Sequence, residues 1–244
     1  MFPGIGTLIN IVAIIGGASI GILVGNRMAI KTRILLTDVL GLTTLLGASI
    51  ALAPMWAKSF TSAFPSGWPL LVILGSLIIG GIIGSLFKLE EKLDSLGESL
   101  RLRFKASSQG SFIEGFVTAS LLFAIGPLAI LGSISDGMST GIDQLLLKST
   151  LDFFASIAFA SALGWGVAAS AIPVGIYQGI WTAIGLFLGQ ILDTYQIDAM
   201  SIVGGTMLIA IGLRLLNIKN ISVGNLLPAL AIAPILSIAV HNLL

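Results

Sequence analysis

Residues 153–192, FFASIAFASALGWGVAASAIPVGIYQGIWTAIGLFLGQIL, form a run of 40 residues without a charged side chain. A helix of that length would measure about 60 Å, which is twice the hydrocarbon core of a bilayer at about 30 Å. The run therefore predicts two membrane crossings. Pro173 is the expected break between them, because proline lacks a backbone N–H and disfavours helix at the preceding residue.

The rest of the chain follows the same pattern. Of its 244 residues 56% are hydrophobic and 9% charged, and the mean hydropathy is +1.06. These values exclude a water-soluble domain, in which about 25% of residues are charged. We predict an all-α, polytopic integral membrane helical bundle that forms a single transmembrane domain over residues 1–244, with about eight transmembrane helices. The predicted spans are residues 5–25, 36–56, 68–87, 112–132, 143–168, 173–192, 198–216 and 223–243.

The loops between the spans set the expected orientation, because cytoplasmic loops are enriched in Lys and Arg. With eight spans and the N-terminus outside, ten of the 12 Lys and Arg residues fall on the cytoplasmic side, and only Lys58 and Lys148 fall outside. We therefore expect both termini to lie outside the plasma membrane.

The one sizeable polar segment lies at residues 88–111. Leucines recur there at three-residue and four-residue spacing opposite acidic residues, which predicts an amphipathic helix at about residues 88–105 on the cytoplasmic membrane surface. A solvated connector and a regulatory or dimerising element are the two interpretations that remain open.

Glycine is frequent, with 30 residues, and several glycines recur at four-residue spacing on one helix face. Bare backbone at such a face lets membrane helices approach closely, and Gly17, Gly21 and Gly25 are the longest example. Tight packing alone accounts for the pattern, which does not separate a transporter from a scaffold.

A weak internal similarity suggests a repeat. GILVGN from Gly21 and VLGLTTLLGASIAL from Val39 resemble GLFLGQ from Gly185 and IVGGTMLIAIGLRL from Ile202. In the expected topology these stretches cross the membrane in opposite directions, which is typical of the inverted repeats of secondary transporters. Chance similarity in a chain rich in Gly and Leu is the alternative.

Two acidic residues near span ends are interpreted as helix-start signals. Ser111 with Glu114, and Thr140 with Asp143, have the spacing of a capping box, in which a hydroxyl and a carboxylate satisfy the first backbone N–H groups.

Asp152 differs from these residues, because it lies eleven residues and about 17 Å beyond Gly141 in the predicted span 143–168, close to the bilayer midplane. A carboxylate at that depth must be paired, water-lined or protonated. Lys148 is one turn away, and Ser149 and Ser156 continue a small, polar face. A solute or proton path is one interpretation. A structural Lys148–Asp152 pair or an interhelical hydrogen bond is another, and proteolytic chemistry is a third.

The span 112–132 carries Gly126 and Pro127 in its middle. Because proline cannot donate a hydrogen bond and clashes one turn back, it frees the carbonyl of Phe123, and we predict a break or sharp kink. Discontinuous helices form binding sites in transporters, whereas a plain proline kink needs no function. Further candidates for the same polar interior are Asp136, Asn10, Gln178 and Asn225.

Several classes of chemistry lack the residues they need. The chain has no cysteine and one histidine, which argues against Cys-ligated or His-ligated metals, thiol nucleophiles and catalytic triads. Twelve basic and 11 acidic residues give no basic patch for nucleic acid. We expect no cofactor, no bound metal, no nucleic-acid partner and no enzymatic activity.

Three stretches resemble a known family. GTLINIVAIIGGASIGILVGNR near the start, GPLAILGSISDG, and KSTLDFFASIAFASALGWGVAASAIPVGIYQG are similar to the YdfK/YqgA-like bacterial membrane proteins, a family of unknown function. The resemblance implies a polytopic protein of a prokaryotic plasma membrane and supplies no reaction. It implies Lys148–Ser149 and Leu151–Asp152 pairs, with glycine often following the aspartate, where this chain has Phe153.

Two functions compete on these observations. Asp152, the broken span and the candidate repeat favour a small-solute or ion transporter or channel. The glycine faces and the amphipathic segment favour a non-transporting scaffold or interaction protein, which could assemble as a homo-oligomer. The expected partners are the lipid bilayer and, for a transporter, a small solute or ion.

Overall fold

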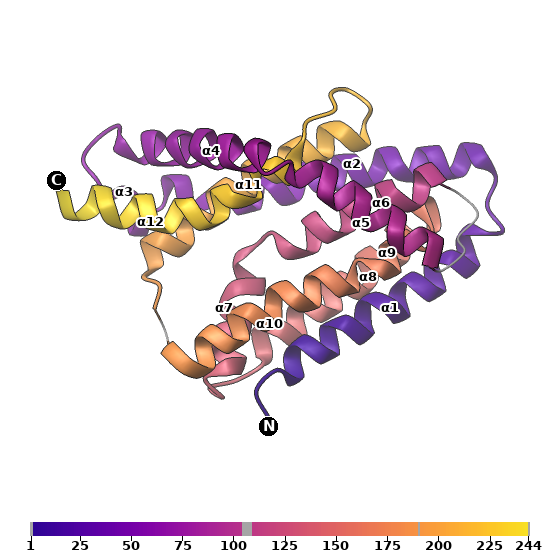
Figure 1. The fold of residues 1–244 in the computed structure, drawn as a ribbon, viewed down its shortest axis with the longest axis horizontal. Helices are drawn as coiled ribbons and strands as arrows, with labels where there is room; N and C mark the ends of the chain where they lie inside the picture. Colours follow the sequence, from indigo (N-terminus) through magenta and orange to yellow (C-terminus); the bar gives the residue numbers. More distant parts are fainter. Residues whose placement is uncertain (1, 104–108, 190, 244) are drawn as a thin grey trace. The chain divides into compact units, whose positions relative to one another are not determined.

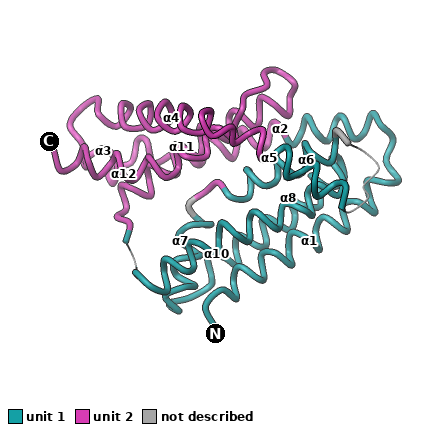
Figure 2. Tube along the Cα trace, in the orientation of Figure 1, with its two compact units in different colours: residues 1–40, 93–124, 128–191 teal, residues 41–92, 125–127, 192–244 magenta. Residues whose placement is uncertain are grey.

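The computed structural model describes residues 2–103, 109–189 and 191–243, and all regular secondary structure in these ranges is helical (Figure 1). The chain forms two compact units, each assembled from segments distant in sequence (Figure 2). Unit 1 comprises Met1–Leu40, Leu93–Ala124 and Leu128–Ile191, and unit 2 comprises Gly41–Lys92, Ile125–Pro127 and Leu192–Leu244.

Unit 1 is built from helices at the start and in the middle of the chain. They are α1 (Ile5–Gly25), the first part of α2 (Ile30–Leu52), most of α5 (Leu89–Arg103), α6 (Gln109–Ala124), α7 (Pro127–Gly137), α8 (Asp143–Leu163), α9 (Gly166–Ala169) and α10 (Ala171–Leu188). Unit 2 contains the remainder of α2, η1 (Ala53–Trp56), α3 (Lys58–Thr61), α4 (Trp68–Leu86), α11 (Thr194–Leu215), η2 (Val223–Leu226) and α12 (Leu227–Leu243).

The number of membrane spans agrees with the prediction. Within the described residues seven helices are long and apolar enough to cross a membrane, and a bent pair raises the number to eight if it is one span. The pair consists of Ser111–Ala124 and Leu128–Gly137, which meet at 64°. Gly126 lies at the bend with φ of 139°, a backbone conformation that L side chains rarely adopt. The predicted break at Gly126 and Pro127 is confirmed.

Contacts at the two ends of this bent pair favour a full crossing. Near its start, Gly115 lies against Leu163 in the last turn of α8. Near its end, the Asp136 carboxylate accepts a hydrogen bond from the backbone N–H of Gly6 in the first turn of α1, at 3.0 Å. Gly17 and Gly25 of α1 lie against Phe153 and Ser161 of α8, so α1 and α8 run in the same direction. The bent pair therefore extends from the end of α8 to the start of α1, over the length of both helices, which supports eight spans.

The break between the fifth and sixth spans is not at Pro173, and that prediction is wrong. The helix α8 ends at Leu163 because Gly164 adopts φ 78° and ψ −152°, which no α-helix accommodates. Pro173 lies in the first turn of α10, where the backbone N–H groups have no intrahelical acceptor and a missing N–H costs little.

Both predicted capping boxes are also wrong. Ser111 lies inside α6, and α8 is preceded by Ile142 with no side-chain cap. The Thr140 hydroxyl instead donates to the carbonyl of Ser135. Thr140 therefore closes the turn after α7 rather than starting α8.

A capping box does occur at the start of α11. Asp193 accepts from the backbone of the first turn, and the side chain of Gln196 accepts a hydrogen bond from the backbone N–H of Asp193. These reciprocal bonds let α11 begin at Thr194, four residues before the predicted start of that span.

The helix α5 occupies the predicted amphipathic segment, of which residues 104–105 lie outside the described residues. Within unit 2, the side-chain oxygen of Asn225 accepts from the backbone N–H of Glu90 in the first turn of α5, at 3.0 Å. The Glu90 carboxylate pairs with Arg214 of α11 at 2.8 Å and accepts from the backbone N–H of Gly224. The start of α5 is thus tied to α11 and η2.

Candidate functional site

A glycine stripe on α1 brings the backbones of α1 and α8 together in unit 1. A Cβ atom at Gly17 or Gly21 would lie 2.3 Å from the carbonyl oxygen of Phe153 or Ile157, and one at Gly25 would lie 2.4 Å from that of Ser161. Both sets of residues rise by four along the chain, so the two helices run in parallel. The predicted close packing at this stripe therefore occurs, and it places α1 side chains directly over α8.

A buried ion pair lies on the α8 side of this contact. The Lys148 ammonium is 2.6 Å from Oδ2 of Asp152 one turn later, and each residue is 6% exposed. The pairing offsets part of the cost of removing both charges from water. The structure thus contains the Lys148–Asp152 pair that the sequence offered as a structural alternative.

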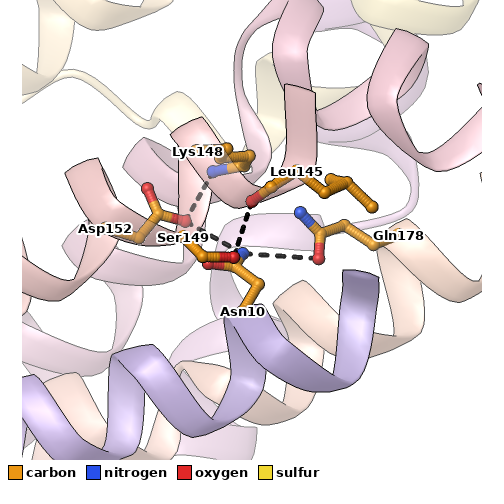
Figure 3. Close-up of polar contacts among 6 residues, drawn as sticks. All are labelled: Asn10, Leu145, Lys148, Ser149, Asp152 and Gln178. Carbon is orange, nitrogen blue, oxygen red and sulfur yellow. Dashed lines mark hydrogen bonds and ion pairs between the residues drawn. The ribbon is translucent and has the colours of Figure 1, made fainter. Parts of the chain in front are cut away.

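Two amide side chains extend this pair across three helices (Figure 3). The Nδ2 atom of Asn10 in α1 donates to Oδ2 of Asp152 at 3.0 Å and to Oε1 of Gln178 in α10 at 3.3 Å. Both amide residues have no solvent exposure. The structure therefore gathers Asn10, Lys148, Asp152 and Gln178, named here the amide–carboxylate cluster, from the first, fifth and sixth spans.

The cluster leaves two buried amide atoms without a hydrogen-bond partner among the described residues, Oδ1 of Asn10 and Nε2 of Gln178. The charge on Asp152 fixes this arrangement. Turning the Asn10 amide over would bring its oxygen against the carboxylate, and turning that of Gln178 would bring two NH₂ groups together. One acceptor and one donor thus remain unused, each at a desolvation cost of about 1–3 kcal/mol.

The two predicted serines of α8 have different surroundings. The Ser149 hydroxyl donates to the carbonyl of Leu145 one turn earlier, as Figure 3 shows, so its hydrogen-bonding capacity is used within the helix. Ser156 lies at the contact with Gly17 of α1, fully buried, and its hydroxyl has no partner among the described residues. Ser156 is one turn beyond Asp152 on the same face.

The other predicted residues make hydrogen bonds or turns of their own. Asp136 is buried and caps the first turn of α1 through Gly6, while Asn225 caps α5 in unit 2. Gly126 and Pro127 form the bend between α6 and α7. Each therefore has a local structural role in the fold, and none of them contacts the cluster through a described hydrogen bond.

Sequence reasoning missed a threonine pair next to the cluster. The hydroxyls of Thr7 in α1 and Thr182 in α10 are 3.4 Å apart and buried. Thr7 precedes Asn10 by three residues and Thr182 follows Gln178 by four, so each shares a helix face with an amide of the cluster. That spacing in the sequence could have identified both threonines as neighbours of the cluster.

Together these side chains form a polar interior in a membrane-embedded unit. The ion pair is neutral overall, but its carboxylate lies beside amide groups with unused hydrogen-bonding atoms. Such a group can hold a proton, exchange Lys148 for another cation, or hydrogen-bond a small polar solute. A solute or proton path at Asp152 stays a prediction, and Asp152 is not among the described residues that line a cavity of about 1000 Å³ in unit 1.

Comparison with known proteins gives family relationships. A family model described as "Protein of unknown function (DUF554)" matches residues 5–238. The chain is 32% identical over 237 residues to the "Uncharacterized membrane protein YdfK" of Bacillus subtilis, covering 97% of this chain and 96% of that protein. It is 32% identical over 240 residues to the "Uncharacterized protein YqgA" of Escherichia coli, covering 96% of this chain and 97% of that protein. No solved structure matches.

Proposed function

The chain belongs to the DUF554 family of membrane proteins, and we propose that it transports a small solute or ion across the plasma membrane, with the amide–carboxylate cluster as its binding site. The observation that carries the proposal is the buried Lys148–Asp152 pair beside two unpartnered amide atoms. Asp152 binds a cation or a proton, and Asn10 and Gln178 select the solute or stabilise the ion. No enzymatic chemistry is part of the proposal.

Energetic cost supports a functional cluster. An ionisable residue in a membrane helix costs about 2.5–3.5 kcal/mol even on insertion scales, and replacing a buried ion pair by apolar residues is often neutral or stabilising. The glycine stripe is sufficient to explain the packing of α1 on α8. A pair that the fold does not need is therefore better explained by binding than by stability.

The candidate inverted repeat also supports transport. The matched residues Gly21 and Gly185 are both packed on the backbone of a neighbouring span, each with its Cβ position 2.3 Å from a carbonyl oxygen. Matched spans contact each other within each unit. Gly175 of α10 lies against Ile11 of α1 in unit 1, and Gly212 of α11 lies against Gly41 of α2 in unit 2. Each unit thus combines elements of both halves, as in transporters built from inverted repeats.

Transport can be tested in liposomes. Purified protein is reconstituted and charge movement is recorded on a solid-supported membrane after concentration jumps of H⁺, Na⁺, K⁺, NH₄⁺ and a set of small zwitterions. We expect a current for at least one of these, abolished in Asp152→Asn, which preserves the shape of the side chain and removes its charge. The matched control is Asp198→Asn, a partly exposed aspartate of α11 that accepts from Ser59. Currents no larger than those of protein-free liposomes for every ion and solute would contradict the proposal.

A non-transporting scaffold is the second candidate. The anchored start of α5 and its charged face favour it, because an amphipathic helix fixed to the bundle can present a surface to a partner or to a second copy of the chain. A stable homo-oligomer in proteoliposomes that carry no current would favour this scaffold. Under either function, we propose that both termini lie outside the membrane.

A further inference from the structure

Unit 1 contains a cavity of about 1000 Å³, separate from the amide–carboxylate cluster. Its volume is at the upper end of ligand pockets, which measure about 300–1,000 Å³. Isoleucines of α1 and α10 form one wall, among them Ile15, Ile172 and Ile176, and all three are exposed. Because exposed isoleucines line it, the cavity opens at the surface of the unit along an apolar wall.

The opposite end of the cavity is polar and basic. Arg33 lines it together with Asn26, and among the described residues that line the cavity Arg33 is the single charged one. Two N–H groups of the guanidinium, from Nε and Nη2, donate to the carbonyl of Gly25 at the end of α1, at 3.2 and 2.6 Å. This contact fixes the guanidinium in place and uses two of its five donors. Arg27 and Lys31 are exposed nearby in sequence and add positive charge.

Trp165 marks the depth of this end. It lines the cavity, is 53% exposed, and lies at the turn between α8 and α9. Tryptophan is enriched at the level of lipid headgroups, where its ring is apolar and its N–H remains hydrated. A basic end at headgroup level and an apolar wall extending from it together match a molecule with an anionic headgroup and an apolar chain.

We propose that this cavity binds an anionic phospholipid, with the phosphate at Arg33 and one acyl chain along the isoleucine wall. Charge complementarity selects the lipid, since Arg33 offers donors and positive charge, and none of the described residues that line the cavity is acidic. The bound lipid fills the space between α1 and α10. The site is independent of the proposed transport.

Native mass spectrometry of the full chain in mild detergent tests the site. Phosphatidylglycerol and phosphatidylcholine with identical palmitoyl-oleoyl chains are titrated, and their Kd values are compared. We expect tighter binding of phosphatidylglycerol, weakened about fivefold in Arg33→Gln, because a lipid contact of one basic residue is worth about that factor. Phosphatidylcholine also carries a phosphate, but its choline cation cancels that charge, so its binding should weaken less than that of phosphatidylglycerol. The matched control Arg103→Gln removes an exposed charge on α5 and should bind both lipids like the wild type.

Three outcomes would overturn the proposal. Equal Kd values for wild type and Arg33→Gln would remove Arg33 from the site. Equal weakening in Arg103→Gln would mean that the lipid senses overall charge only. Displacement of the lipid by glycerol phosphate at similar concentration would mean that the site recognises the free headgroup rather than a lipid.

A second measurement covers the case in which Arg33→Gln does not fold. Wild-type protein is irradiated with phosphatidylglycerol that carries a diazirine in its acyl chain, and the cross-linked peptides are sequenced. Cross-links in the segment of Ile172 and Ile176 are expected. Cross-links confined to other segments would refute the acyl-chain position.

Discussion

The Lys148–Asp152 pair can be removed as a unit, which separates a structural role from a binding role. The perturbation is the double substitution Lys148→Met with Asp152→Leu, compared with each single substitution. Both side chains are less than 10% exposed and their charged atoms are 2.6 Å apart, so neither ion has water to compensate the loss of its partner. Each single variant should therefore lose about 3–5 kcal/mol of unfolding free energy.

The double variant should be far more stable than either single one. Replacing a buried ion pair by apolar residues of similar volume is neutral or stabilising by about 1–4 kcal/mol. Against this, Nδ2 of Asn10 loses its bond to Asp152 and keeps only the longer one to Gln178, which costs about 1–3 kcal/mol. The two terms nearly cancel, so the double variant should lie within about 2 kcal/mol of the wild type.

Equilibrium unfolding in mixed micelles, with SDS as denaturant, measures stability, and the liposome current measures function. We expect the double variant to be nearly as stable as the wild type and to carry no current. A stable double variant that retains the wild-type current would refute the role of Asp152 in transport. A double variant as unstable as the single ones would refute the argument that the fold does not need the pair.

Three further predictions follow from the same contacts. Gly21→Ala places a Cβ 2.3 Å from a backbone oxygen, so α1 and α8 must separate by about 1 Å at a cost of about 1–3 kcal/mol, whereas Gly179→Ala, with open space around it, should be neutral or stabilising in the same unfolding assay. Glu90→Gln should release the start of α5 and increase its amide hydrogen exchange; exchange equal to wild type would show that the Arg214 pair does not fix α5. Single cysteines at Ser62 and Ser99 should react with impermeant maleimide from outside and from inside respectively, and labelling of Ser99→Cys from outside would reverse the orientation.

Much of the fold follows from sequence because the bilayer leaves few options. Helices must satisfy their own backbone hydrogen bonds, so charge-free runs locate the spans, and a mid-span glycine and proline locate the bend at residues 126–127. Span ends follow less well from sequence where local backbone geometry decides them. Gly164 ends α8 through a positive φ that sequence does not reveal, while Pro173 occupies a first turn in which proline is tolerated.

The site was only half predictable. Lys148 and Asp152 are four residues apart, so their pairing follows from helix geometry alone. Asn10 and Gln178 could be named because polar residues in membrane spans are rare, but their contact with Asp152 depends on how α1 and α10 pack on α8. The spacing of Gly17, Gly21 and Gly25 indicates that another helix packs closely against α1, but it does not identify that helix.

The charge of Asp152 has a consequence beyond its own binding capacity. Since Asn10 donates its NH₂ group to the carboxylate, the carbonyl oxygen of Asn10 must point elsewhere. The same NH₂ group also donates to Oε1 of Gln178, so the NH₂ group of Gln178 points away and has no partner among the described residues. The carboxylate therefore determines which atoms of both amides are left to bind a ligand. With leucine at position 152 the constraint is lost and both amides are free to turn over. A substitution at Asp152 should consequently alter selectivity at Asn10 and Gln178 even for a neutral solute that never contacts the carboxylate.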